Sequence, residues 1–159
     1  MELRDLIHEA QPFAGIRLSI GAVRSGWYSL DNRSGNGADC VHDLEAYPYP
    51  LPDSCAVEVW AGHVVNRIDP ARFGFIRWMN ELWRLLVPNG ELNFVSYFGT
   101  NGRYVADPCA CNAISEQTFA YFDPAHKSGL WQVFQPSPWA IKDMAFAADG
   151  NLEVLLGKR

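Results

Sequence analysis

The residues of greatest chemical interest lie where apolar, strand-like segments end. In the stretch LSIGAVRSGWYSLD, an alternating run with Leu18 and Ile20 is followed by Gly21, and a second apolar run closes on Asp31. An open α/β sheet binds a nucleotide at a place of this kind. Only a few residues join the two runs, so the usual glycine-rich loop and its helix are absent. The stretch therefore indicates either a shortened cofactor site or the remnant of one.

The four cysteines suggest a second kind of chemistry, metal binding. They are Cys40, Cys55, Cys109 and Cys111. One residue separates Cys109 from Cys111, which is too tight for a two-ligand zinc knuckle, and no histidine lies nearby in sequence. We therefore expect no metal site, and we interpret the cysteines as reduced, mostly buried thiols.

Length and composition limit the class of protein. The chain has 159 residues, of which 48% are hydrophobic and 13% aromatic, and this predicts one ordered domain over residues 1–159. A formal net charge of −5 argues against the basic stripe that nucleic-acid binders carry. Apolar runs are too short to span a bilayer, and the N-terminus has no apolar signal segment. We expect a cytoplasmic protein that binds neither nucleic acid nor membrane.

Five short apolar segments in the first hundred residues predict strands. They cover residues 16–20, 27–31, 38–42, 56–60 and 91–97. The fourth shows no clean alternation, which is typical of a parallel strand covered on both faces. The prolines of AYPYPLPDS exclude regular structure just before that strand, because each proline removes a backbone donor.

The segment before the fifth strand has the strongest helical signal. Asp69 is a good N-cap and Pro70 a good first helical residue, and VPNG is expected to end the helix. Apolar residues at helical spacing are expected to face the core, and polar ones to face away. The apolar set is Phe75, Ile76, Met79, Leu82, Trp83 and Leu86, and the polar set is Arg77, Asn80, Glu81 and Arg84.

Shorter elements are expected near both ends of the chain. Apolar spacing predicts a helix over residues 3–10, and Ser115 caps a short helix that reaches Phe122. Alternating runs over 144–148 and 152–156 flank Asp149-Gly150, a strong hairpin signal. The order predicts an α/β, Rossmann-like fold: a mostly parallel twisted sheet with helices on both faces and a C-terminal antiparallel hairpin.

Three stretches resemble one family, the class I S-adenosylmethionine-dependent methyltransferases, in particular its small bacterial and phage-type members. They are GADCVHDLEAYPYPLPDSCAVEVWAGHVVNRI, MNELWRLLVPNGELNFVSYF and ADPCACNAISEQTFAYFDP. The first is similar to a family run that passes from Val-His-Asp-Leu through a proline-rich loop to a strand ending in Ser-His-Val-Leu-Glu-His. The resemblance covers most of residues 15–125 and implies a single methyltransferase-like domain.

The resemblance implies contacts to S-adenosylmethionine, position by position. Gly21 matches the first glycine after the first strand. Asp31 matches the acidic residue that would accept hydrogen bonds from both ribose hydroxyls, as a carboxylate can. Asp43 and Leu44 match the pair beside adenine, a carboxylate for the exocyclic amine and an apolar wall for the ring.

Gly62 and His63 match the residues near the sulfonium and amino-acid end of the cofactor, and His63 is the implied catalytic residue. Each assignment has a structural alternative. Asp31 and Asp43 can instead be strand-end residues that hydrogen-bond a turn, and His63 can be a structural histidine.

The sequence also departs from the family. Val23 stands where the family has a second glycine, and we expect its side chain to narrow the space for the methionine portion. Asn66-Arg67 replaces a Glu-His pair, and Asp107-Pro108-Cys109-Ala110 replaces Asp-Pro-Thr-His, so a base or substrate-orienting histidine is absent. Methyl transfer can proceed by proximity and alignment, because the sulfonium is already an activated leaving group.

Two functions of different classes follow from these residues. The favoured one is an S-adenosylmethionine-dependent methyltransferase whose partner is a methyl acceptor that the sequence does not identify. The alternative is a non-catalytic binding or assembly module that keeps the methyltransferase fold and has lost cofactor binding; Val23 and the short first loop favour it. A nicotinamide-dependent oxidoreductase is disfavoured, because the phosphate-binding glycines and the helix start are absent.

Overall fold

The computed structural model describes residues 15–159, and its centre is a seven-stranded sheet with the order β3-β2-β1-β4-β5-β7-β6. The helix expected over residues 3–10 lies outside the described residues. The strands are β1 (Ile16–Ile20), β2 (Tyr28–Asp31), β3 (Cys40–Val41), β4 (Ala56–Gly62), β5 (Leu86–Tyr97), β6 (Trp139–Phe146) and β7 (Asn151–Lys158).

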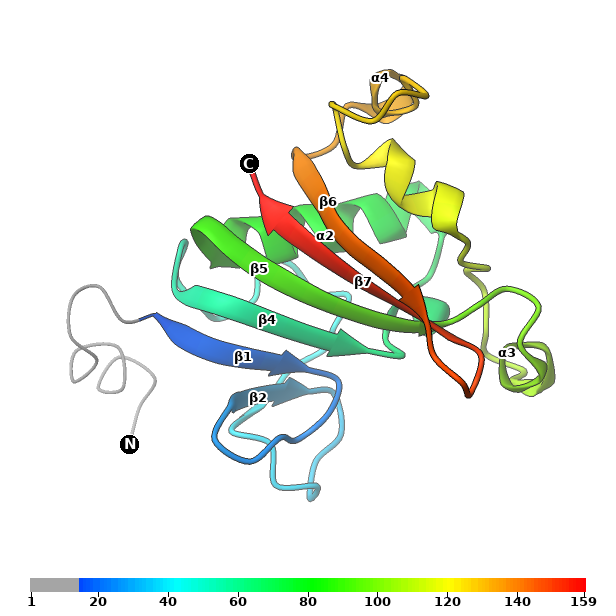
Figure 1. Cartoon of the computed structure of the whole chain (residues 1–159). Helices are drawn as coiled ribbons and strands as arrows, with labels where there is room; N and C mark the ends of the chain where they lie inside the picture. Colours follow the sequence, from blue (N-terminus) through cyan, green and yellow to red (C-terminus); the bar gives the residue numbers. More distant parts are fainter. Residues whose placement is uncertain (1–14) are drawn as a thin grey trace.

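The strand directions confirm the expected mostly parallel sheet with a C-terminal antiparallel hairpin. Strands β1 to β5 pair in parallel, whereas β7 pairs antiparallel with both β5 and β6. The twisted sheet and its C-terminal hairpin are visible in Figure 1. Asp149 and Gly150 lie in the turn between β6 and β7, and Gly150 has a φ of 80°. The chain therefore has a mostly parallel, Rossmann-like sheet with an antiparallel hairpin at one edge.

Short helices surround this sheet, and one longer helix packs on it. They are η1 (Val65–Arg67), η2 (Ala71–Phe73), α2 (Gly74–Leu85), α3 (Gly102–Ala106), η3 (Glu116–Tyr121) and α4 (Trp131–Phe134), where η marks a 3-10 helix. The expected short helix capped by Ser115 is η3. Within residues 15–159, no helix is long and apolar enough to cross a bilayer.

The main helix begins later than expected. Pro70, expected to be the first helical residue, is instead the N-cap of the 3-10 turn η2, and Asp69 lies one residue before it, where its Oδ1 accepts a hydrogen bond from the Ala71 N–H at 2.8 Å. Arg72 and Phe73 then adopt left-handed φ angles of 52° and 60°, which interrupt the helix. Helix α2 starts at Gly74, where a Cβ would collide with the Asp69 carbonyl oxygen.

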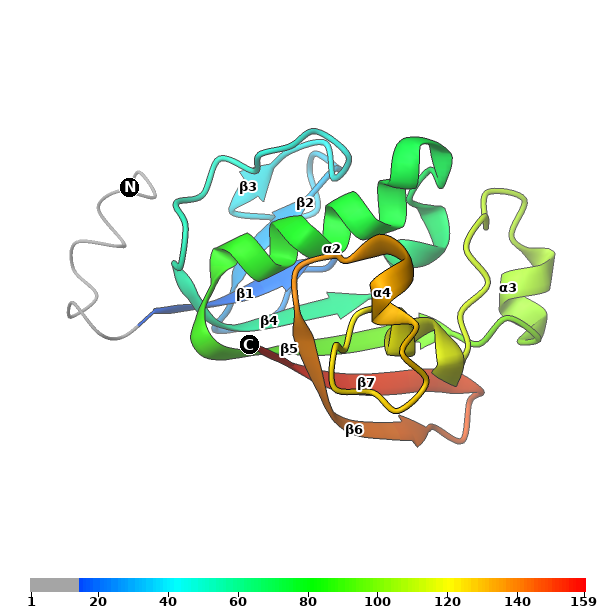
Figure 2. The same ribbon diagram turned by 90° about the horizontal axis from the view of Figure 1, so that it is seen from above.

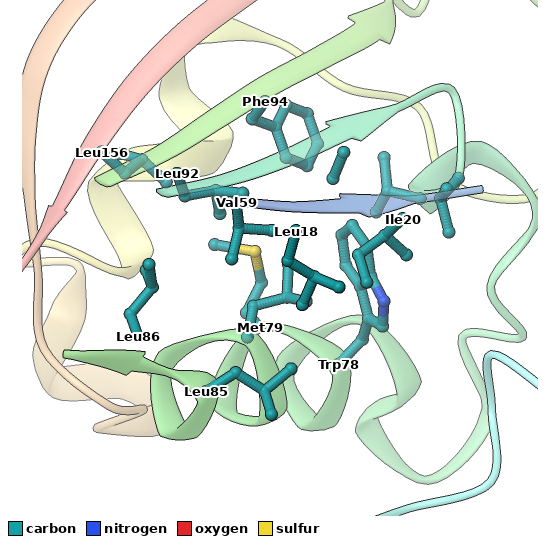
Figure 3. Close-up of a cluster of buried hydrophobic side chains, with 14 of the residues drawn as sticks. Leu18, Ile20, Val59, Trp78, Met79, Leu85, Leu86, Leu92, Phe94 and Leu156 are labelled. Atoms are coloured by element: carbon teal, nitrogen blue, oxygen red, sulfur yellow. The ribbon is translucent and has the colours of Figure 1, made fainter. Parts of the chain in front are cut away.

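The expected inward face of α2 was partly wrong. Figure 3 shows Trp78 and Met79 pointing from α2 toward the sheet, and both, like Leu85, are 0% exposed. Trp78 and Leu85 were not in the expected apolar set. Phe75, Ile76 and Trp83 were in that set, yet each is only partly buried.

The reason is a second packing surface on α2, made by the proline-rich segment before β4. Glu81, expected to face solvent, is buried and accepts a hydrogen bond from the Tyr49 N–H at 2.7 Å. Arg84 Nη2 donates to Glu81 Oε1 at 2.6 Å, and Trp78 Nε1 donates to the Tyr49 hydroxyl at 3.1 Å. Polar side chains of α2 thus hold this segment in place, and helical spacing alone cannot reveal such partners.

The two faces of the sheet differ in the helices that pack on them. Helices α2 and η3 lie on one face, and no helix of residues 15–159 lies on the opposite face of β1, β4 and β5 (Figures 1 and 2). The expected helices on both faces are therefore wrong for these strands, because the β1–β2 and β2–β3 connections contain no helix. On that face Arg17 Nε donates to Glu58 Oε2 at 3.0 Å. Arg24 lies over the rings of Trp27 and Trp60, 4.8 and 4.5 Å from their centroids. We call this surface the open face; the β1–β2 loop covers part of it.

Candidate functional site

A cleft of about 590 Å³ opens at the carboxyl ends of β1, β2, β4 and β5. This volume is in the range of small-molecule sites. The chain leaves β1 toward β2 on one side, and β4 flanks β1 on the other, so the cleft lies at the switch point where open α/β sheets bind ligands. All six residues predicted from the sequence line it: Gly21, Asp31, Asp43, Leu44, Gly62 and His63.

The two glycines have packing reasons to be glycine. Gly21 has a φ of 79°, and its N–H donates to the Leu30 carbonyl at 2.9 Å. A Cβ on Gly21 would collide with the side chain of Val64. A Cβ on Gly62 would collide with the ring of Trp60. Both positions let neighbouring side chains close the floor of the cleft.

The loop after Gly21 does not place Val23 as expected. Val23 is 47% exposed and does not line the cleft, so the expected narrowing by its side chain is not seen. Ala22 lines the cleft instead, and its carbonyl accepts a hydrogen bond from Ser19 Oγ at 2.6 Å. This bond ties the start of the loop to β1, and Val23 lies outside the cleft.

Asp31 ends β2 with its carboxylate fully engaged by its own turn. Oδ1 accepts from the Arg33 N–H at 3.0 Å and from Arg33 Nε at 3.3 Å. Oδ2 accepts from Arg33 Nη2 at 2.9 Å and from Asn36 Nδ2 at 2.8 Å. Burial tends to raise the pKa of Asp31, but the hydrogen bonds and charge of Arg33, with the bond from Asn36, lower it overall. Asp31 is therefore ionised and saturated with donors.

Asp43 and Leu44 form the opposite wall of the cleft. Asp43 is exposed, and its Oδ1 accepts from the Glu45 N–H at 3.0 Å. Its Oδ2 accepts no hydrogen bond from residues 15–159 and is free for a ligand. The Leu44 side chain is buried, and its carbonyl accepts from the Tyr49 hydroxyl at 2.8 Å, which ties this wall to the proline-rich segment.

His63 has the most unusual surroundings of the six. It adopts a φ of 58°, its N–H donates to the Val95 carbonyl at 2.8 Å, and its ring lies 4.2 Å from the Tyr97 ring. Burial lowers the pKa of the imidazole, with a smaller contribution from Arg103 against an opposing one from Asp149. Buried Nδ1 has no hydrogen-bond partner in the described part of the chain. Burial thus favours the neutral form of the ring, and Nδ1 is shut off from solvent.

Sequence reasoning identified the departures from the family but not where they would lie. Asn66, Arg67 and Asp107 all line the cleft. Arg67 Nε and Nη2 are each 2.9 Å from Asp107 Oδ2, so an ion pair stands where the family has an acid and a histidine. The pKa of Asp107 is lowered by the Cys109 N–H and by Arg67. Asn66 and Arg67 replace the family's Glu-His pair, whereas Asp107 keeps the aspartate of the family's Asp-Pro-Thr-His pattern, and the sequence did not indicate that Arg67 and Asp107 would pair.

Arg33 also lines the cleft, and it was not among the predicted residues. Its place two residues after Asp31 was the available signal, because a strand-end carboxylate often accepts from the turn that follows. As for metals, no group of three or more His, Cys, Asp or Glu side chains within residues 15–159 is placed to hold an ion.

The sequence matches no family model and no curated protein. Solved structures do match. An S-adenosylmethionine-dependent methyltransferase from Mesorhizobium loti is 12% identical, with 97% of this chain and 96% of that chain covered and a TM-score of 0.60. One from Archaeoglobus fulgidus is 13% identical, with 98% and 91% covered and a TM-score of 0.63.

The cyclase SpnF is similar as well, with 13% identity, 98% of this chain and 79% of that chain covered, and a TM-score of 0.54. The chain therefore has the fold of the S-adenosylmethionine-dependent methyltransferases. Since a cyclase has a similar fold, the reaction has to be argued from the cleft.

Proposed function

We propose that this protein binds S-adenosylmethionine in the cleft and transfers its methyl group to a small or surface-exposed acceptor. The observation that carries the proposal is the convergence of all six sequence-predicted residues on one cleft, at the switch point of this fold. The two methyltransferases of similar fold support the choice of cofactor.

The charges of the cleft suit a cationic ligand. Its lining has four carboxylates and two guanidinium groups: Asp31, Asp43, Glu45 and Asp107, with Arg33 and Arg67. Each guanidinium already pairs with a carboxylate, so the unpaired charge is negative. The sulfonium and amino groups of S-adenosylmethionine are positive and are attracted to such a lining.

Each wall has a proposed task. The free Oδ2 of Asp43 would accept from the adenine amine, and Leu44 would pack against the ring. Gly21 and Ala22 would adjoin the methionine portion, with Asp31 at the ribose. When bound, the cofactor supplies a methyl group on an activated sulfonium, so the protein's main task is alignment.

His63 is the proposed catalytic residue. Its lowered pKa favours the neutral imidazole, which is the form that would accept a proton from the acceptor, and the residue lines the cleft. The Arg67–Asp107 ion pair lies on the same cleft and would orient the acceptor. His63 would raise the rate of methyl transfer without being essential, since the leaving group on the sulfonium is already activated.

Calorimetric titration with S-adenosylmethionine and S-adenosylhomocysteine tests the proposal. We expect both to bind, and Asp43→Ala to weaken binding about tenfold or more, as loss of a hydrogen bond to a charged group does. Asp143→Ala is the control, because Asp143 is an exposed residue of β6 that does not line the cleft. Absence of binding to the wild type at millimolar ligand would contradict the proposal.

One observation favours the second candidate, a non-catalytic module with this fold. The Asp31 carboxylate that would receive the ribose is 1% exposed, and donors of its own turn occupy both of its oxygens. If no adenosine-bearing ligand binds to the wild type or to any variant with Asp31 released, the module becomes the better account.

A further inference from the structure

We infer that Arg33 is a built-in competitor for the ribose position of the cleft, and that it sets the affinity for adenosine-bearing ligands. The inference rests on the proposed function, because it takes Asp31 as the group that would receive the ribose. It adds a residue that controls how well the cleft accepts that class of ligand.

The guanidinium of Arg33 lies between the two motif residues that a ligand must reach. Its Nη2 is 2.9 Å from Asp31 Oδ2 and 3.4 Å from the carbonyl oxygen of Gly21. Gly21 follows β1 and Asp31 ends β2, so Arg33 bridges the two neighbouring strands at their carboxyl ends. A nucleoside that hydrogen-bonds Asp31 has to enter this same space.

The number of hydrogen bonds that Asp31 can accept determines which donors have to leave before a ribose can bind. A carboxylate has about four acceptor positions, and four N–H groups approach Asp31 within 3.3 Å. Two of them, Nε and Nη2, belong to the Arg33 side chain. A ribose diol brings two O–H donors, so it can replace those two while the Arg33 main chain and Asn36 stay bound.

The Arg33 side chain is free to leave. It is 67% exposed, so its guanidinium exchanges hydrogen bonds with Asp31 for hydrogen bonds with water. Gly35 and Gly37 in the following turn have φ angles of 79° and 84°, and no atom lies within 4 Å of where a Cβ would be. Open space thus surrounds these two glycines, and the hydrogen bonds to Asp31 and to the Gly21 carbonyl are what restrain the Arg33 side chain.

The competition has a consequence for salt dependence. Adenosine is uncharged, so salt does not screen its own attraction to Asp31 to a first approximation. Salt does weaken the ion pair that adenosine has to displace. Added sodium chloride should therefore tighten adenosine binding to the wild type, and this effect should vanish when Arg33 is replaced.

The experiment is titration of adenosine and S-adenosylhomocysteine into the wild type, Arg33→Ala and Arg33→Met. We expect both variants to bind about tenfold more tightly than the wild type, since an exposed charge no longer has to be displaced. Arg17→Ala is the matched control, because Arg17 makes a similar exposed ion pair with Glu58 on the open face. Asp31→Asn should weaken binding with and without Arg33.

The outcomes separate this inference from the proposed function. Tighter binding in both Arg33 variants supports the inference, even if the wild type shows no binding and the proposed function fails. Unchanged or weaker binding in the variants, beside a wild type that binds, overturns the inference and makes Arg33 neutral or a ligand contact. If no protein binds either ligand, both are overturned.

Discussion

The two faces of the sheet are stabilised in different ways. On the α2 face, fully buried apolar side chains of the helix pack against the strands (Figure 3). On the open face, Arg17 pairs with Glu58, and Arg24 lies over two tryptophan rings. Parallel sheets are usually covered on both faces. Here the connections from β1 to β2 and from β2 to β3 contain no helix, and the strands show polar side chains instead.

Replacement of Trp78 should give the largest loss of stability. Trp78 is 0% exposed between α2 and the sheet. Trp78→Ala should lower the free energy of unfolding by about 3–5 kcal/mol, as large-to-small core changes do. Trp83→Ala is the matched control, because Trp83 is only partly buried and lies under Lys158. Chemical denaturation of both variants tests this, and an equal loss in the two would mean that the faces of α2 are wrongly assigned.

Replacement of Glu81 and of Glu58 compares the loss of stability at a buried carboxylate with the loss at a more accessible one. Glu81 is buried, accepts from the Tyr49 N–H and pairs with Arg84, so Glu81→Ala should cost about 3 kcal/mol. Glu58→Ala on the open face should cost about 1 kcal/mol or less. Urea denaturation of both variants measures the difference. Equal costs would show that the open face contributes as much as the helix-covered one.

Arg24 tests how much the cation–π contacts stabilise the open face. Arg24→Ala removes a cation from over Trp27 and Trp60, and we expect a loss of about 1 kcal/mol. Arg24→Lys should recover part of it, because a charge remains over the rings. The thermal midpoints of the two variants provide the comparison. A loss as large as that of Trp78→Ala would mean that the open face is part of the core.

His63, which follows β4 and lines the cleft, should give a small pH dependence of stability. Burial lowers its pKa in the folded state below the ordinary 6.5, so the unfolded chain binds more protons at mildly acidic pH. Stability should therefore fall as the pH drops below about 6.5, and this contribution should not change at higher pH. His63→Asn, which suits the left-handed backbone, should remove the dependence. His126→Asn should retain it.

The sequence predicted the elements whose structure is determined by a short-range pattern of residues. Alternation predicted β1 at its observed bounds, and Asp149-Gly150 predicted the hairpin of β6 and β7. Residues at the ends of parallel strands meet at one edge, so the six predicted residues meet in one cleft. Their roles toward a ligand stay predictions.

Long-range partners explain most of what the sequence did not predict. Glu81 was assigned to solvent because nothing near it in sequence indicates that Tyr49 donates to it. We expected the Val23 side chain to narrow the cleft. In the structure Ala22, whose carbonyl accepts from Ser19 Oγ, lines the cleft instead, and Val23 does not. The saturation of Asp31 depends on how its turn folds back, which places Arg33 and Asn36 on one carboxylate.

The direct link from β1 to β2 changes the order in which this sheet can assemble. Leu18 pairs with Tyr28 and Leu30 with Cys40, so both parallel pairings join residues ten positions apart. In the antiparallel part, Leu92 pairs with Leu156, sixty-four positions away. By chain-closure entropy, the longer loop costs about 1.6 kcal/mol more to close. Parallel pairs are usually the slow, non-local step of folding, but here β1, β2 and β3 have the contact order of a hairpin and can form before the rest of the sheet.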